Sequence, residues 1–363
     1  MKPTTANEDL REVLRDVLGG DVTARHDQAA AGIGFDTELW EELSRLGFTA
    51  LTTPEERGGS GAGWLEAAVL LGESAAAARH LPLAESDLLA QWVLRVAGRL
   101  PDDPRTPRTI AVVDPAGTAR AVPWLGSIPV VVAARRADGA LAVTELAPGA
   151  LAERATVKPV PTNSGQPRAD LQLEADLPNA AVLEATTAGA LLDELVLRGA
   201  LARAVQAAAA LDKAVDMCVE HTTARVQFGR PLAKFQAVQH LVADAAAEAA
   251  LARASVEAAV LDAAETGLAG SASATKVAAA RSCVGHATSV VVRNAHQAHG
   301  AIGTTQEHPL QLFTLPALDW RGEFGTTRDW DRFLGETARS RPRALWDVVI
   351  GAPAADATPA VRR

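Results

Sequence analysis

The sequence predicts a mainly α protein with a central β-domain: an N-terminal helical domain, a small β-barrel-like domain and a C-terminal four-helix bundle. Apolar residues recur at helical spacing at both ends of the chain, whereas short β-branched runs separated by turn residues fill the middle. The breaker-rich stretch PDDPRTP marks the first boundary. We therefore expect domains over 1–103, 104–185 and 186–350, with a flexible tail over 351–363.

Four helices are expected in the N-terminal domain, because leucine, valine and tryptophan return every three or four residues and glycines follow the first two runs. They cover Leu10 to Leu18, Leu39 to Leu46, 64–79 and 84–100. The turn-rich segment PEERGGSGAG separates the second helix from the third.

The middle of the chain reads as strands: TIAVV, PVVVAA, LAVTEL and the alternating DLQLEA, with ADGA as a hairpin signal. Long runs rich in alanine and leucine follow, with short connections between them, which favours an antiparallel bundle. The bundle helices are expected over 187–222, 232–266, 271–298 and 328–350.

Charge and composition exclude several classes of protein. Forty-four acidic against 35 basic residues give a net charge of -9 without a basic block, which argues against nucleic-acid binding and against docking on an anionic membrane. The longest apolar stretches, such as 128–134, are far shorter than the ~20 residues that span a bilayer. The N-terminus is too polar for a signal peptide, and two cysteines make no disulfide framework. We expect a cytoplasmic protein without membrane insertion.

The segment ARVQFGRPLAKFQAVQHLVAD, 224–244, carries a candidate anion site. Gly229 and Pro231 should interrupt a long helix, and Arg225 lies at the break, where a guanidinium can grip a phosphate through two parallel hydrogen bonds. The helix that starts after Pro231 adds free N–H groups and a favourable dipole. An ordinary helix–turn–helix with a solvated arginine is the alternative.

A second candidate lies in NAHQAHGAIGTTQEHPLQ, 294–311. Gly300 and Gly303 would let the backbone approach a flat or charged ligand, and Gln297 suits an adenine edge or a phosphate oxygen.

Three histidines, His296, His299 and His308, lie in the same segment. Their spacings do not match a helical pair of metal ligands with a carboxylate, so we expect no metal site.

The order of these features resembles the acyl-CoA dehydrogenase family over nearly the whole chain. WEELSRLGFTALTTPEERGGSGAGWLEAAVLLGE is similar to the family's entry helix, its Pro-Glu-Glu-x-Gly-Gly turn and the next helix. RVQFGRPLAKFQAVQH is similar to the Arg-x-Gln-Phe-Gly-x-Pro-Leu-x-x-Phe-Gln signature. QAHGAIGTTQEHPL is similar to the Gln-x-x-Gly-Gly-x-Gly-x-x-x-Glu signature, with Ala301 in place of the second glycine.

The resemblance implies a homo- or heterotetramer with FAD at its subunit interfaces. The flavin would accept a hydride from the β-carbon of an acyl-CoA thioester while a carboxylate removes the α-proton, and an electron-transfer flavoprotein would then accept the electrons. Arg225 and Gln227 would hold the pyrophosphate of a flavin whose ring lies in the neighbouring subunit. The residues that would border its adenosine part are Phe228, Phe235 and Gln236. Those that would meet its ADP portion are Gln297, Gly300 and Ala301.

The middle domain departs from the family pattern. The Thr-Glu-Pro-x-x-Gly-Ser-Asp stretch that lines the family's flavin and acyl pocket is replaced by VVDPAGTA, 112–119. Its part from Val113 to Ala119 is one residue shorter than the family stretch and lacks the leading threonine. The family's Trp-[Ile/Phe]-[Thr/Ser] strand is absent, and Trp124 is the domain's only tryptophan. The chain thus keeps the half-site that reaches a neighbour's flavin, and we expect that it has lost the half-site for its own.

The catalytic base is also displaced. In many members it is a Glu in a Glu-Gly-Thr turn, but RGEFGTTRD puts Glu323 one residue out of register, with Phe324 at the expected position. Glu323 is therefore the candidate base, and a solvated surface acid is the alternative. At the family's other base position, on the first bundle helix, this chain has Arg198 or Gly199, with Glu194 about a turn away. A one-residue displacement usually defeats proton transfer, because a base must come within hydrogen-bonding distance.

Some bacterial members are α2β2 heterotetramers of steroid side-chain degradation, in which one subunit has lost the flavin pocket and base. The sequence resembles such a degenerate partner. Four interpretations stay open: a subunit of an FAD-dependent acyl-CoA dehydrogenase, a non-catalytic subunit that completes an active partner, a flavin-dependent oxygenase, and a helical scaffold without flavin.

Overall fold

The computed structural model describes residues 5–20 and 34–340. Contacts between residues group the chain into two units. The first comprises Met1–Leu18, Ala31–Leu70 and His80–Gly199, and contains N-terminal helices and the β-domain. The second comprises Gly19–Ala30, Leu71–Arg79 and Ala200–Arg363, and contains the helical bundle. The three-domain division of the sequence stays a prediction.

The N-terminal helices lie where the apolar periodicity places them. They are α1 (Thr5–Leu18), α3 (Thr37–Arg45) and α4 (Trp64–Ala76), with two short 3-10 turns, η1 (Phe48–Ala50) and η2 (Glu55–Arg57), between α3 and α4. Asp36 begins α3, because its carboxylate accepts a hydrogen bond of 3.0 Å from the Leu39 N–H. The helix expected over 84–100 is shorter and begins differently: a buried π-helix, η3 (Ala84–Gln91), leads into α5 (Trp92–Val96).

A carboxyl group is buried in the π-helix. Asp87 accepts hydrogen bonds from the Thr52 N–H at 2.8 Å and from the Thr53 hydroxyl at 3.3 Å. Burial raises the pKa of Asp87 to about 6 and outweighs these hydrogen bonds, which lower it. At neutral pH the fold therefore holds a carboxylate that it would accommodate better protonated.

Replacing Asp87 with asparagine is expected to stabilise the chain increasingly as the pH rises from about 4 to about 7. The pKa of Asp87 in the unfolded chain lies near ~3.9, so the stability that its proton confers is lost as the pH rises through the folded pKa of about 6. The advantage of the variant should reach at most about 3 kcal/mol at neutral pH, measured by urea unfolding. The opposite sign is expected for Asp329→Asn, because hydrogen bonds from Thr326 lower the pKa of that exposed carboxyl. A pH-independent difference for Asp87→Asn would contradict the prediction.

The β-domain expected from the sequence is present and consists of two sheets. One has the order β1-β3-β4-β7 and the other the order β2-β6-β5. The expected runs form β1 (Thr109–Val113), β3 (Val130–Arg135), β4 (Leu141–Leu146) and β6 (Arg168–Leu173), and a short helix α6 (Pro148–Ala152) follows β4. As predicted, β3 and β4 pair antiparallel across the ADGA turn. Three further strands were not expected: β2 (Thr118–Pro123), β5 (Ala155–Pro159) and β7 (Ala181–Leu183).

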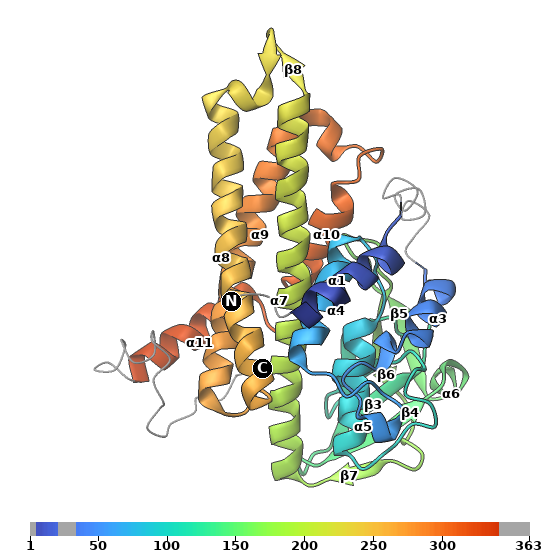
Figure 1. The fold of residues 1–363 in the computed structure, drawn as a ribbon. Helices are drawn as coiled ribbons and strands as arrows, with labels where there is room; N and C mark the ends of the chain where they lie inside the picture. The colour runs from blue at the N-terminus through green and yellow to red at the C-terminus, as the bar shows by residue number, and fades with distance from the viewer. Residues whose placement is uncertain (1–4, 21–33, 341–363) are drawn as a thin grey trace. The chain divides into compact units, whose positions relative to one another are not determined.

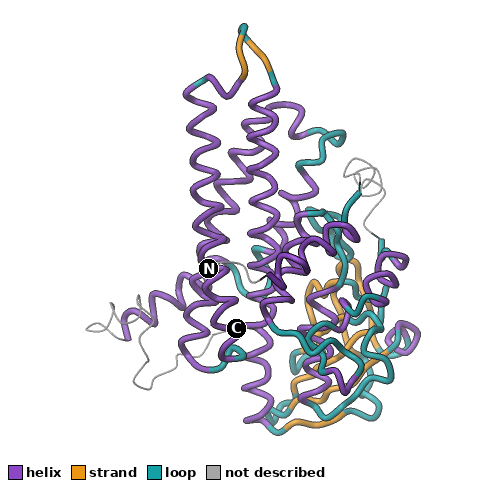
Figure 2. The backbone as a smooth tube through the Cα atoms, in the orientation of Figure 1, coloured by secondary structure: helices purple, strands orange, loops and turns teal. Residues whose placement is uncertain are grey.

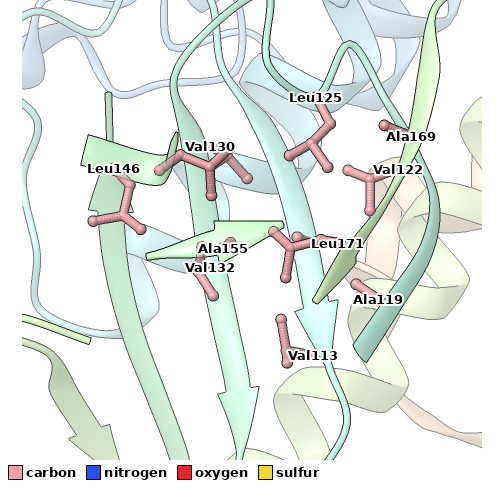
Figure 3. Packing of buried hydrophobic residues seen from close by; sticks show 12 residues of the cluster. Val113, Ala119, Val122, Leu125, Val130, Val132, Leu146, Ala155, Ala169 and Leu171 are labelled. Carbon is pink, nitrogen blue, oxygen red and sulfur yellow. The ribbon is translucent and has the colours of Figure 1, made fainter. Parts of the chain in front are cut away.

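Residues of both sheets form one buried core. Figure 3 shows Val113 of β1 and Val130 and Val132 of β3 together with Leu171 of β6, on strands of the two sheets. The cluster contains only alanine, valine and leucine, so aliphatic packing carries the burial.

The bundle helices are long and nearly continuous, as expected. They are α7 (Ala185–Ala224), α8 (Gln236–Thr266), α9 (Gly270–His299) and α11 (Thr327–Ser340). The predicted end of the last helix, 341–350, and the tail over 351–363 lie outside the described residues. An unexpected helix, α10 (Gln311–Trp320), precedes α11 and contains Pro316, which disfavoured a helix at the sequence level. Within the described residues, no helix has the length and apolar character needed to cross a membrane.

Candidate functional site at the end of the bundle

The segment between α7 and α8 is a small β-hairpin followed by a 3-10 turn. Strand β8 (Val226–Gln227) pairs with β9 (Arg230–Pro231), and η4 (Leu232–Lys234) leads into α8. Figures 1 and 2 show the hairpin projecting beyond the ends of α7 and α8. Its base is fixed by backbone hydrogen bonds of 2.9 Å from Arg225 N–H to the His221 carbonyl and from Leu232 N–H to the Arg225 carbonyl. The predicted interruption of the helix is therefore a hydrogen-bonded hairpin that projects from the end of the bundle.

The tip of this hairpin exposes an aromatic ring. Phe228 has φ 52° and is 90% exposed, and Gly229 has φ 79°. Two consecutive residues with positive φ turn the chain tightly and aim the Phe228 ring outward. The ring also lies 6.1 Å from that of Phe235, which is covered by the Arg230 guanidinium at 4.2 Å. The tip is thus a rigid apolar and cationic surface.

Four polar side chains predicted to bind the flavin are exposed, and none makes a side-chain hydrogen bond within the described part of the chain. They are Arg225, Gln227, Gln236 and Gln297. A guanidinium and three amides offer charged and neutral donors together with amide acceptors, which suits a ligand with phosphate and polar ring edges. The residues present therefore fit the diphosphate and adenine parts of FAD.

The two motifs meet at one end of the bundle. His221, in the last turn of α7, stacks on His299, the last residue of α9, with ring centroids 4.5 Å apart. Because Arg225 follows His221 by four residues and Gln297 precedes His299 by two, both predicted flavin segments start from neighbouring helix ends.

Helix α9 is followed by Gly300, which has a backbone conformation that favours glycine. Gly300 has φ 66° and ψ -145°, and it opens the 3-10 helix η5 (Gly300–Thr304). Ala301, which replaces a glycine of the family signature, is exposed, so its methyl group meets no buried neighbour. Gly303 is different, because a Cβ there would lie 2.6 Å from the His299 Cβ. Gly303 is thus required by close packing.

His299 is the most perturbed histidine of this region. Burial lowers its pKa to about 4, with smaller contributions from neighbouring histidines. Its Nδ1 lies 2.8 Å from the Ala295 carbonyl, which assigns the proton to Nδ1. At neutral pH the ring is therefore uncharged, with its lone pair on Nε2.

Glu323, the candidate base, lies in the turn between α10 and α11 and is held by an arginine. Its Oε2 accepts a hydrogen bond of 2.9 Å from Nε of Arg203, and the side chains are 11% and 1% exposed. Arg203 also donates to Gln206 at 2.7 Å. Phe324, at the register expected for the base, has φ 51°. The Glu323 carboxylate is thus part of a buried ion pair, and the surface-acid alternative does not describe it.

A second buried arginine, Arg281 of α9, holds the backbone of the same turn. Its guanidinium donates to the carbonyls of Trp320, Arg321, Glu323 and Gly325 at distances of 2.7 to 3.2 Å. Burial lowers the pKa of Arg281 to about 10, so it remains protonated at neutral pH.

Arg198, one of the two residues expected at the family's other base position, is also fixed in place. It makes an ion pair of 2.8 Å with Glu194, one turn earlier on α7, and its guanidinium lies 4.4 Å from the centre of the Trp92 ring. Neither Arg198 nor Gly199 carries a carboxylate.

The segment that replaces the family's flavin loop is a closed turn. Asp114 accepts hydrogen bonds of 2.9 Å from the N–H groups of Ala116 and Thr118, and the Gly117 N–H donates to the Asp114 carbonyl at 2.9 Å. Trp124 is completely buried in the β-domain, 6.3 Å from the ring of Phe35. The Asp114 turn and the buried Trp124 side chain thus stabilise the β-domain itself.

Comparison with known proteins identifies the class. A model of the acyl-CoA dehydrogenase N-terminal domain matches residues 4–99, and one of the acyl-CoA dehydrogenase C-terminal domain matches residues 192–326. Acyl-CoA dehydrogenase IpdE2 of Mycolicibacterium smegmatis is 30% identical over 312 residues, which cover 84% of this chain and 90% of that protein. These matches define an oxidoreductase that acts on the CH–CH bond of acyl-CoA.

Two solved structures share the fold. The ChsE4-ChsE5 complex of Mycobacterium tuberculosis has a TM-score of 0.79 at 22% identity, and the match covers 93% of this chain and 98% of the other. A variant of the Tcur3481-Tcur3483 steroid ACAD has a TM-score of 0.77 at 22% identity, with the same coverage. The chain belongs to the acyl-CoA dehydrogenase family.

The sequence could not identify every residue that shapes this region. It singled out His299 and His308, but their partner His221 lies 78 positions before His299, in a helix without any local signal. Arg203 and Arg281 were missed as well, because buried arginines on helices look like surface charges until their partners are known.

Proposed function

We propose that this chain is a subunit of an FAD-dependent acyl-CoA dehydrogenase and contributes the end of its bundle to a flavin site that a neighbouring subunit completes. The observation that carries the proposal is the set of exposed polar side chains that make no side-chain hydrogen bond to any described residue, beside the 90% exposed ring of Phe228. In an isolated chain these exposed polar side chains and the Phe228 ring add nothing to stability. A ligand would bind the polar side chains, and a second subunit would cover the ring.

Each predicted residue has a distinct role in this proposal. The Arg225 guanidinium and the Gln227 amide would hold the pyrophosphate, while Phe228, Phe235 and Gln236 would border the adenosine. Gln297, Gly300 and Ala301 would face the ADP portion, where the glycine allows close approach of the backbone. A flavin held by these residues would supply the redox chemistry of the dehydrogenation.

The missing half of the site is proposed to come from a homologous subunit. Asp114 uses its carboxylate within its own turn, and Trp124 is committed to the domain core, so neither is free to line a flavin. The ChsE4-ChsE5 complex and the Tcur3481-Tcur3483 steroid ACAD, which share the fold, each carry the names of two proteins. We therefore propose a heterotetramer acting on a steroid side-chain acyl-CoA or another bulky acyl-CoA, with electron-transfer flavoprotein as acceptor.

A second candidate is a non-catalytic subunit that completes the site of an active partner. The ion pair between Arg203 and Glu323 favours it, because the hydrogen bond to the buried guanidinium holds the carboxylate in place instead of leaving it free to approach a substrate. At the other base position the expected residue is Arg198 or Gly199, and neither has a carboxylate that could act as the base. In this form the partner supplies both base and substrate pocket.

Co-expression with a homologous acyl-CoA dehydrogenase subunit of the same genome tests the proposal. We expect native mass spectrometry to show a heterotetramer, and visible absorbance to show flavin in the complex but not in this chain alone. Arg225→Ala should leave assembly intact and weaken flavin binding at least about tenfold, since a charge-assisted hydrogen bond contributes about 1.5–3 kcal/mol.

Arg253→Ala is the matched control, because Arg253 is an exposed residue of α8 paired with Asp212 and should not affect flavin content. Full flavin occupancy in the Arg225→Ala complex would contradict the role of Arg225. One flavin per chain in a homotetramer of this protein alone would contradict the partner.

A further inference from the structure

The end of the bundle also holds a cluster of three histidines to which the flavin proposal gives no role. One nitrogen from each of His221, His299 and His308 lies within 4.8 Å of the others. The three residues come from different segments: the last turn of α7, the last turn of α9 and the connection that leads to α10. They are brought together by the fold, which explains why sequence spacing predicted no metal site.

The orientation of the central ring suits a metal ligand. His299 is 5% exposed, and the hydrogen bond between its Nδ1 and the Ala295 carbonyl directs the lone pair to Nε2. This is the arrangement found in metal sites, where the second ring nitrogen of a ligating histidine donates to a carbonyl. Nε2 of His299 is buried and has no hydrogen-bond partner among the described residues. A buried acceptor of this kind is costly unless something binds it.

The neighbouring side chains define the ligand set. The ring of His308 lies 4.7 Å from that of His299, at an interplanar angle of 63°. His296 belongs to a different environment, because its Nε2 bonds the Thr314 hydroxyl at 3.0 Å. Cys218 Sγ lies 4.0 Å from Nδ1 of His299, on the side that faces the backbone. Three imidazoles thus converge, without a carboxylate or thiolate among them.

We propose that His221, His299 and His308 bind a divalent transition-metal ion of the zinc type. Zinc–imidazole bonds of about 2.0–2.1 Å in tetrahedral geometry place ligand nitrogens about 3.3 Å apart, so small side-chain rotations of His221 and His308 close the site. The Nδ1 of His308 accepts a hydrogen bond of 3.2 Å from the Leu310 N–H. His308 either binds the metal through Nε2 and keeps this hydrogen bond, or binds it through Nδ1 and loses it. The fourth position is open to water.

Such an ion would join three segments, two of which lead to the exposed polar groups. It would tie the end of α7, four residues before Arg225, to the end of α9, two residues after Gln297, and both to the connection before α10. Its effect is to fix the relative positions of two ligand-binding segments. This inference concerns metal binding alone and holds whether or not the chain binds a flavin.

Metal titration of the untagged full-length chain tests the proposal. After treatment with a chelator and desalting, one Co²⁺ per chain should bind and develop the intense visible absorption of tetrahedral cobalt, and Zn²⁺ should displace it stoichiometrically. Zn²⁺ should also raise the melting temperature. His221→Gln and His308→Gln should each weaken binding at least tenfold, while His240→Gln, an exposed histidine of α8, should leave it unchanged.

The outcomes are decisive. No cobalt absorption with the wild-type chain overturns the proposal, as does binding that both His221→Gln and His308→Gln retain. The direct titration of the wild-type chain keeps the proposal falsifiable even if a variant does not fold. Binding lost equally in His240→Gln would assign the metal to surface histidines, and so would also overturn it.

Discussion

Replacing Arg281 with methionine is expected to destabilise the chain by about 3–5 kcal/mol. Its guanidinium donates to four carbonyls of the turn between α10 and α11, and methionine would remove this donor, although the Trp320 carbonyl would keep its hydrogen bond from the Glu323 N–H. A loss of this size exceeds a usual surface substitution several-fold, because each partly buried carbonyl that loses its partner carries its own desolvation cost. Urea unfolding followed by circular dichroism measures it.

Arg253→Met provides the matched control. It removes the same charge from the same unit, but at a position 51% exposed, where the ion pair with Asp212 is screened by solvent. If both variants lost similar stability, the carbonyl cluster would not be the cause. The Arg281→Met variant should also release Glu323, because the same turn carries its side chain toward Arg203.

A second large effect is expected at Gly59, in the turn-rich segment before α4. The N–H groups of Ser60, Gly61 and Ala62 donate back to the carbonyls of residues 50, 53 and 51, so the chain closes tightly on itself. A Cβ on Gly59 would lie 2.1 Å from the Thr53 carbonyl oxygen, which is backbone and cannot rotate away. Gly59→Ala must therefore break this loop, at a cost of about 2–4 kcal/mol in urea unfolding.

Gly189→Ala tests whether loss of a glycine alone is responsible. Gly189 lies in α7, and a Cβ there has no atom within 4 Å, so we expect unchanged or higher stability from the better helix former. Equal losses in the two variants would exclude the steric explanation. The Pro-Glu-Glu-x-Gly-Gly motif that supports the family resemblance thus contains a packing requirement.

Periodicity predicted most of the fold because most helices bury one face. Helices α7, α8 and α9 begin and end within a few residues of the expected positions, and Gly267, with φ 65°, ends α8 as a glycine should. Strand β2 escaped prediction because a bulge between Ala119 and Val122 breaks its alternation. Helix α10 escaped because Pro316 lies inside it. Each miss is a place where tertiary packing overrides a local rule.

The residues of the candidate site also fall into two groups, those with a local sequence signal and those without one. Arg225 and Gln297 could be proposed from sequence because they belong to linear motifs, and both are exposed and make no side-chain hydrogen bond to residues 5–20 or 34–340. The environment of Glu323 could not be found, since its partner Arg203 lies 120 residues earlier. The same applies to His221, whose ring meets that of His299 only after α7 and α9 align their ends. Long-range pairing of charged and aromatic groups has no local signature.

The exposed ring of Phe228 affects how stable an unassembled copy of the chain is against degradation in a cell. Val219, Val226, Leu251 and Ile302 are also largely exposed in the second unit, so an orphan copy would carry apolar side chains that chaperones and proteases recognise. Synthesis of the proposed partner subunit in equal amount would cover these side chains and protect the chain from degradation. The amount of this chain would then follow the amount of the partner subunit. Deletion of the partner's gene would lower the level of this protein without changing the level of its transcript.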